Sequence, residues 1–317
     1  MKKRNRKPYR KKKIRKPSRI MVIMKIIFVI TICSFLFIGF EYFSNINKEF
    51  ISTSSIRYYI DTVDSISKPK QQLNWQEVAA IDGAKKGNNF ENRNEKSLRN
   101  IAESFYMKVN ISNKYVVKDF DTVIKEINLT SKEEKLAYKN LEKLKEVSIR
   151  RKVEGVNELK ESFIESLRKG SLAVYKKYGV LPSVTISQAI LESDWGRSSL
   201  ASEYNNYYGI KADKSWKGKV ANLTTKENHS DVIKDNFRVY NSVEESVEDL
   251  GKFLNENSRY RNNGLFQGKN YIEQAQALED AGYSTAKNEG GDKIYADLLI
   301  DVIKENNLML IDCELEK

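Results

Sequence analysis

The longest apolar stretch of the chain runs over residues 20–40, where Lys25 is the only charged residue. It is about 21 residues long, and a helix needs roughly 20 apolar residues to cross the hydrocarbon core of a bilayer. No small residues suited to signal-peptide cleavage follow it. Residues 41–43 are one acidic and two aromatic residues, which suit a membrane interface. The pattern predicts a retained single-pass transmembrane anchor over residues 20–43, with a cleavable signal peptide as the alternative.

Residues 44–72 are polar and of mixed composition, which predicts a juxtamembrane stalk that is partly helical at best. Beyond the stalk, apolar residues recur at helical spacing in several short segments. Thr130 and Ser131 are each followed three residues later by a glutamate, the spacing of a capping box, and a long charged pattern follows. Residues 73–155 therefore predict a helical spacer module, in which no residues suggest chemistry.

The C-terminal half, residues 156–317, mixes helical patterns with short strand-like ones. Pro182 stands at the start of an apolar helix, where its missing N–H costs little. Strand-like segments follow at residues 207–211, 220–225 and 237–240, and the last two flank a polar loop, as in a β-hairpin. An amphipathic helix capped by Asn241 or Ser242 comes next, followed by helices at about 271–280 and 291–306. The predicted fold class is α+β, mostly α, with one small hairpin.

The formal net charge of +12 is concentrated at one end of the chain. Residues 1–19 carry twelve Lys and Arg and no acid, and the rest of the chain is formally neutral. Such a density of positive charge would suit binding to nucleic acid. However, cations directly before a membrane span are explained by topology and by attraction to anionic lipids, so we expect no nucleic-acid partner. The charge predicts a cytoplasmic tail over residues 1–19 and an extracytoplasmic C-terminal part. The expected partners of the anchor are membrane lipids and a possible membrane-protein partner.

Cysteine and histidine are too scarce for several kinds of site. The two cysteines are Cys33, inside the apolar stretch, and Cys313, near the C-terminus, and the single histidine is His229. The exported part therefore lacks a disulfide framework. It also has too few Cys and His residues for a typical metal site or a Cys–His catalytic pair. We expect no metal and no cofactor, and chemistry that relies on carboxylates and tyrosines.

Glu192 is the best candidate for such chemistry. It stands at the end of the apolar helix that Pro182 opens, with Trp195 expected one turn later on the same face and Gly196 letting the chain turn away. A glutamate in an apolar niche beside an aromatic ring has a raised pKa, because desolvation disfavours its charged form. Cleavage of a glycosidic bond requires such a carboxylic acid beside the bridging oxygen.

The segments around Glu192 resemble the signature of glycoside hydrolase family 73, which contains bacterial endo-β-N-acetylglucosaminidases of the autolysin type. The resemblance covers about residues 163–308. The matching segments are Gln188–Gly196, Asn205–Lys211, Thr224–Glu227, Phe237–Tyr240, Arg259–Tyr260 and Ala281–Thr285. It implies a lysozyme-like catalytic domain within residues 156–317. It further implies hydrolysis of the β-1,4 bond between N-acetylglucosamine and N-acetylmuramic acid in peptidoglycan glycan strands.

The resemblance also implies site residues. Glu192 corresponds to the catalytic acid, Glu227 to a second carboxylate that activates water or steadies the cation, and Tyr283 to a tyrosine of the catalytic site. The implied substrate-binding residues are Gln188, Trp195, Asn206, Tyr207 and Tyr208. Glu227 could serve as the base of an inverting reaction, or the acetamido group of the substrate could attack first.

The chain departs from the family pattern after Tyr283. The family usually reaches another Tyr-Ala pair within a few residues, whereas residues 286–294 intervene here before Tyr295 and Ala296. The local loop must therefore differ. Two other functions stay open at this point: a lytic transglycosylase acting on the same substrate, and a non-catalytic glycan-binding scaffold of the envelope.

Overall fold

The computed structural model describes residues 50–68, 70–109, 115–153, 157–227 and 231–315. The predicted cytoplasmic tail and the predicted anchor over residues 20–43 lie outside these ranges. Within them, no helix combines the length and the apolar character that crossing a bilayer requires. From Ile51 onward, the described residues belong to one compact unit.

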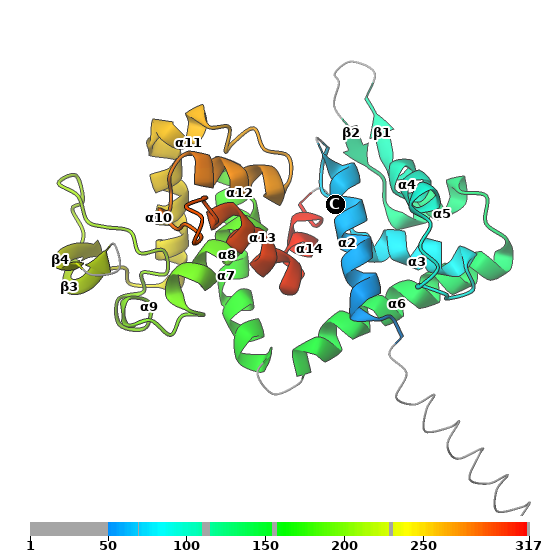
Figure 1. Cartoon of the computed structure of the whole chain (residues 1–317), viewed down its shortest axis with the longest axis horizontal. Helices are drawn as coiled ribbons and strands as arrows, with labels where there is room; N and C mark the ends of the chain where they lie inside the picture. Colours follow the sequence, from blue (N-terminus) through cyan, green and yellow to red (C-terminus); the bar gives the residue numbers. More distant parts are fainter. Residues whose placement is uncertain (1–49, 69, 110–114, 154–156, 228–230, 316–317) are drawn as a thin grey trace, which may run out of the picture. The chain divides into compact units, whose positions relative to one another are not determined.

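The fold is mostly helical, with two small antiparallel hairpins (Figure 1). The N-terminal part contains α2 (Thr53–Ser67), α3 (Trp75–Lys85), α4 (Glu95–Ser104), β1 (Tyr106–Lys108), β2 (Tyr115–Val117), α5 (Phe120–Glu126) and α6 (Ser131–Val153). The C-terminal part contains α7 (Asn157–Tyr178), α8 (Pro182–Ser193), α9 (Ser199–Tyr204), β3 (Val220–Glu227), β4 (Asp231–Arg238), α10 (Val243–Glu256), α11 (Ser258–Asn262), α12 (Tyr271–Asp280), α13 (Tyr295–Glu305) and α14 (Met309–Asp312). The predicted class, α+β and mostly α, is confirmed.

The predicted hairpin is present as β3 and β4, whose register pairs Val220 with Arg238 and Glu227 with Asp231. The predicted strand at residues 207–211 is wrong. Only Lys211 forms a bridge, to Phe237. The side chain of Asn206 bonds the backbone of Ile210 and so closes this segment into a turn. The hairpin β1–β2 was not predicted, because strands of three residues leave almost no periodic signal.

The prediction of a stalk is wrong where α2 lies. Ser52 caps this helix by accepting a hydrogen bond from the backbone N–H of Ser55. Ile56, Tyr59 and Val63, spaced by three and four residues, are buried along one face. The segment read as polar because its other face is exposed, yet it is a packed part of the fold.

The region from α3 to α6 is mostly helical and includes the β1–β2 hairpin. Thr130 and Glu133 form the capping box, with Thr130 N–H donating to Oε2 of Glu133 at 2.8 Å. The helix α3 packs along α6. Gly83 allows this approach, because a Cβ there would lie 2.4 Å from the ring of Phe90 and 3.2 Å from the amide of Asn140.

The helix α8 is the centre of the C-terminal half. Ten of its twelve residues are buried, because α7, α12, α13 and α14 all contact it. Its first turn has no cap from its own sequence, and Asp312 of α14 accepts a hydrogen bond from the backbone N–H of Ser183 instead. The C-terminal end of this buried helix carries Glu192, so the packing of α8 fixes the backbone of the candidate acid.

Candidate active site

The helix α8 ends immediately after Glu192. Asp194, Trp195 and Gly196 all have left-handed backbone, with φ values of 51°, 60° and 77°. Two successive non-glycine residues in this region are unusual and are often found at functional sites. Because the chain leaves the helix here, Trp195 does not share the helical face of Glu192, and that prediction is wrong.

The aromatic neighbour of Glu192 is Tyr295, at the start of α13. Its hydroxyl donates a hydrogen bond to Oε1 of Glu192 at 2.9 Å. The ring of Tyr283 stacks on that of Tyr295, with centroids 5.5 Å apart and planes inclined by 15°. Two tyrosines from different segments therefore stand beside the carboxyl group. The Tyr295–Ala296 pair was visible in the sequence, but its hydrogen bond to Glu192 was not predicted.

The electrostatic environment of Glu192 suits an acid. Its side chain is exposed at the end of α8, and protein packed around the carboxyl group still removes enough water to raise its pKa above the ordinary value. The hydrogen bond from Tyr295 favours the charged form and offsets part of this rise. The result is a carboxyl group that a substrate can reach and that holds its proton to higher pH than a free glutamate.

The segment that departs from the family pattern forms a closed loop. Lys287 and Lys293 pair across it, and the backbone N–H of Asn288 donates to the carbonyl oxygen of Asp292 at 2.9 Å. The added residues therefore return the chain to nearly the same place, which is why Tyr295 can stack on Tyr283. The pKa of Tyr283 is raised first by burial and next by the charge of Glu192, so Tyr283 lies within electrostatic reach of Glu192.

Trp195 and Tyr207 share one aromatic neighbour, Phe163 of α7. The ring centroid of Phe163 is 6.0 Å from that of Trp195 and 5.8 Å from that of Tyr207. The ammonium group of Lys160 lies 4.5 Å from the centre of the Trp195 ring. Trp195 and Tyr207 are each partly exposed, so both can offer ring surface to a sugar.

The other three expected substrate-binding residues are buried. Gln188 donates to the Tyr295 hydroxyl at 3.4 Å and thus supports the tyrosine that touches Glu192. Both amide hydrogens of Asn206 are used by backbone carbonyls, those of Ile210 and Arg238. Tyr208 is 3% exposed, and its carbonyl oxygen accepts a hydrogen bond from Tyr283. These contacts make the three residues part of the packing around the site, and their contact with substrate stays a prediction.

The expected second carboxylate is described only in part. The backbone of Glu227 forms the last residue of β3, opposite Asp231, and its side chain lies outside the described part of the structure. Trp216, near the base of the hairpin, packs on the ring of Tyr240 and under the guanidinium of Arg238. This contact gives Trp216 a packing role.

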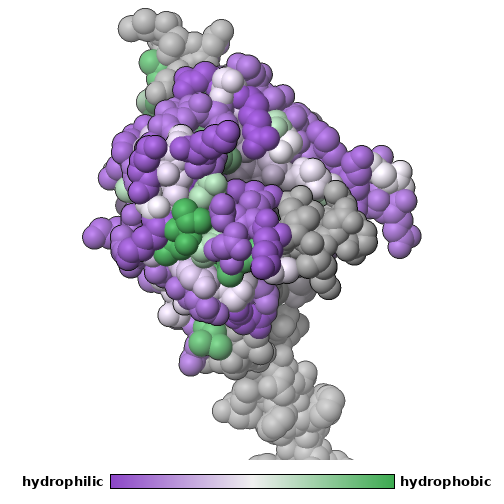
Figure 2. Space-filling model, turned by 90° about the vertical axis from the view of Figure 1, so that its left-hand side faces the viewer, coloured by the Kyte–Doolittle hydropathy of each residue, from purple (hydrophilic) through white to green (hydrophobic). Residues whose placement is uncertain are grey.

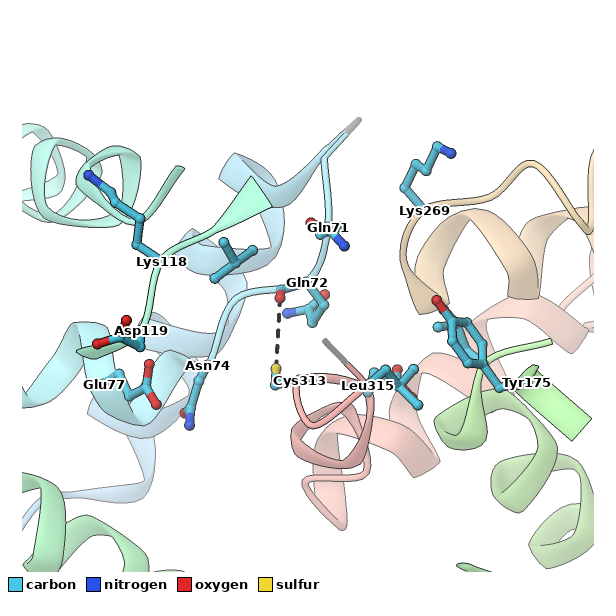
Figure 3. Close-up of a pocket in the computed structure, with 13 residues that line it drawn as sticks. Gln71, Gln72, Asn74, Glu77, Lys118, Asp119, Tyr175, Lys269, Cys313 and Leu315 are labelled. Carbon is cyan, nitrogen blue, oxygen red and sulfur yellow. Dashed lines mark hydrogen bonds between the residues drawn. The ribbon is translucent and has the colours of Figure 1, made fainter. Parts of the chain in front are cut away.

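The surface that carries α9, the β3–β4 hairpin and α10 is mostly hydrophilic, with small apolar patches (Figure 2). A surface of this kind is compatible with the binding of a polar polymer. A cavity of about 410 Å³ lies elsewhere, between the α2–α3 connection, Tyr175 of α7 and the end of α14 (Figure 3). It contains none of the residues around Glu192. Within the described ranges, no three His, Cys, Asp or Glu side chains are grouped as metal ligands would be.

Comparisons with known proteins point to one family of enzymes. The glucosaminidase family, described as mannosyl-glycoprotein endo-beta-N-acetylglucosaminidase, matches residues 170–308. The exo-glucosaminidase LytG of Bacillus subtilis is 34% identical over 170 residues, which are 52% of this chain and 57% of LytG. The peptidoglycan hydrolase FlgJ of Vibrio parahaemolyticus is 34% identical over 148 residues, covering 45% of this chain and 46% of FlgJ.

Among solved structures, the catalytic domain of the autolysin Auto from Listeria monocytogenes is 31% identical, with a TM-score of 0.40. The match covers 48% of this chain and 87% of that domain. The chain spans about half the length of the full-length relatives that it matches. The match of residues 170–308 includes Glu192, Tyr283 and Tyr295. This part of the chain is a domain of the glucosaminidase family of glycoside hydrolases.

Proposed function

We propose that this protein hydrolyses the β-1,4 bond between N-acetylglucosamine and N-acetylmuramic acid in peptidoglycan, with Glu192 as the general acid. The observation that carries the proposal is the setting of Glu192 at the exposed end of a buried helix. The protein packed around the carboxyl group removes water and so raises its pKa. The 2.9 Å hydrogen bond from Tyr295 orients the same group. A protonated carboxyl group fixed in this way can deliver its proton to the oxygen of a leaving sugar.

The surrounding residues have separate roles in this reaction. Tyr283 and Tyr295 present hydroxyl groups and π-faces beside the sugar on which positive charge develops. Trp195 and Tyr207 supply ring faces on which neighbouring sugars stack. Glu227 activates the attacking water or steadies the cation from the β3–β4 hairpin. The fold that holds these residues is lysozyme-like, as the family resemblance implies.

The location of the enzyme follows from its first 43 residues. The anchor over residues 20–43 holds the domain at the outer face of the cell membrane, and the basic tail stays in the cytoplasm. This places the catalytic domain next to newly made glycan strands. The anchor is surrounded by lipids and is available to a membrane-protein partner. If the full chain is recovered in the soluble rather than the membrane fraction of cells, this part of the proposal is wrong.

Digestion of purified peptidoglycan by the full chain tests the activity. We expect fragments that end in reducing N-acetylglucosamine, identified by mass spectrometry. Glu192→Gln should remove cleavage, because loss of a general acid costs about 10²–10⁴-fold in rate. Asp194→Asn is the matched control. Asp194 is exposed and pairs with Arg197, so this variant should keep wild-type activity.

The products separate the alternatives. Anhydro ends would show a lytic transglycosylase, and binding to glycan without any cleavage would show a scaffold. Fragment length decides between internal and terminal cleavage. The Bacillus subtilis relative is named an exo-enzyme, whereas the family description is that of an endo-enzyme. Wild-type activity in Glu192→Gln would refute the assignment of the acid.

A further inference from the structure

The helix α2 lies outside the family match, yet its side chains bond to two helices of the matched domain. Asp64 of α2 is 4% exposed and accepts a hydrogen bond from the hydroxyl of Tyr271, the first residue of α12. The ammonium group of Lys304, near the end of α13, lies 2.8 Å from Oδ1 of Asp61 and 3.8 Å from Oδ2 of Asp64. α2 therefore holds both α12 and α13.

The bonds to Asp64 form a specific arrangement. Its Oδ1 accepts a hydrogen bond from the side-chain amide of Gln72 at 2.9 Å, and its Oδ2 accepts the bond from Tyr271. A buried carboxylate is costly unless donors surround it, so loss of one donor weakens the whole arrangement. Burial also raises the pKa of Asp64, while these donors and Lys304 favour its charged form.

A short series of hydrogen bonds connects α12 to Glu192. At the far end of α12, Oε2 of Glu279 accepts a hydrogen bond from the backbone N–H of Ala296 at 3.0 Å. Ala296 directly follows Tyr295, whose hydroxyl donates to Glu192. The position of α12 thus fixes the first turn of α13 and, with it, the tyrosine beside the catalytic carboxyl.

We infer that α2 is a built-in part of the catalytic unit, in which Asp64 and Tyr271 are positioning residues that hold α12 and α13 so that Tyr295 meets Glu192. The inference rests on the proposed function for its kinetic consequences. It makes the segment before residue 73 a support of the active site, in place of a passive connection to the membrane. The family match alone gives no sign of this, because it begins at residue 170.

Tyr271→Phe in the full chain tests this inference, because it removes only the hydroxyl group that Asp64 accepts from. We expect kcat on purified peptidoglycan to fall by about tenfold, with KM nearly unchanged, since small misplacements of catalytic groups are costly. A looser Tyr295 should also raise the pKa of Glu192 and move the high-pH limb of the rate profile upward. On a Tyr295→Phe background, Tyr271→Phe should add no further kinetic effect.

Tyr59→Phe is the matched control. The hydroxyl of Tyr59, also on α2, donates to the buried carboxylate of Asp82 at 2.6 Å, and that bond stays within the N-terminal part. This variant should lower Tm and leave kcat and the pH profile as in the wild type. If both variants change kcat equally, or if Tyr271→Phe lowers Tm alone, the inference is overturned.

Two further measurements keep the test decisive. Backbone hydrogen exchange at residues 295–299 should quicken in Tyr271→Phe and stay unchanged in Tyr59→Phe, whatever the substrate of the enzyme proves to be. Unchanged exchange in both would refute the inference. If wild-type protein cleaves no peptidoglycan, the proposed function fails while the exchange result still stands. Lys304→Met, which removes the partner of Asp61, serves if Tyr271→Phe does not fold, and should change exchange and kcat in the same direction.

Discussion

Tyr295 and Glu192, which are 103 residues apart in the sequence, are joined by a hydrogen bond of 2.9 Å between the tyrosine hydroxyl and Oε1 of the carboxyl group. Desolvation raises the pKa of Glu192, and this bond lowers it in part. Desolvation is the larger effect, so the carboxyl group stays protonated to higher pH than usual, while the hydrogen bond fixes its direction. Each is needed in a group that must hold a proton and then release it to one oxygen atom.

Tyr295→Phe should separate the two effects. Because the hydroxyl stabilises the charged carboxylate, its loss raises the pKa of Glu192 further, and the high-pH limb of kcat/KM moves upward. At the same time kcat should fall by about tenfold, because the carboxyl group loses its orientation. Tyr106→Phe is the control, since its hydroxyl bonds the backbone of Gln71 far along the chain. An unchanged pH profile in Tyr295→Phe would contradict this account of Glu192.

Glu227→Gln should weaken cleavage less than Glu192→Gln does. A residue that activates water or steadies a cation can be replaced in part by solvent, whereas the proton donor cannot. Comparison of kcat for the two variants on purified peptidoglycan checks this. If Glu227→Gln had no effect, the substrate's own acetamido group would become the favoured nucleophile.

Gly196→Ala should destabilise the turn that carries Trp195. The glycine has φ of +77°, and a Cβ would lie 2.8 Å from the ring of Phe163. We expect a loss of about 1 kcal/mol from the left-handed backbone and a further 1–3 kcal/mol, roughly, from the contact. Gly264→Ala is the control, because its φ of +86° carries the strain with nothing within 4 Å. Chemical denaturation measures both, and equal losses would rule out the contact with Phe163.

Asp312→Asn should change how stability depends on pH. Burial raises the pKa of Asp312 from its ordinary 3.8 to about 7, against the opposing hydrogen bonds from Ser183. A raised folded-state pKa contributes stability that is fully present below pH 3.8 and is lost as the pH rises through about 7.

The asparagine variant has no charge to bury, so its Tm relative to wild type should rise across that window. The full difference is on the order of 4 kcal/mol. Asp301→Asn, at an exposed position on α13, should show no such trend in Tm. A Tm difference between Asp312→Asn and wild type that stays constant from pH 4 to pH 8 would show that Asp312 does not titrate in this range.

Local features of the sequence determined the elements whose signals lie within a few residues. The capping box at Thr130, the cap at Ser242, the start of α8 at Pro182 and the β3–β4 hairpin were all predictable. Hydrophobic spacing and side-chain bonds to nearby backbone act over one or two turns, so the sequence displays them directly. The motif around Glu192 likewise indicated the family and the acid.

Tertiary structure alone decided which side chains meet. The left-handed turn after Ser193 moved Trp195 away from the face of Glu192, and the chain path brought Tyr295 to that face instead. Asn206 faces inward because backbone carbonyls on two segments need its amide. Asp64 and Asp61 of α2 bond to Tyr271 and Lys304, which follow more than 200 residues later. Contacts at such separations follow from how all elements pack together, and no local pattern encodes them.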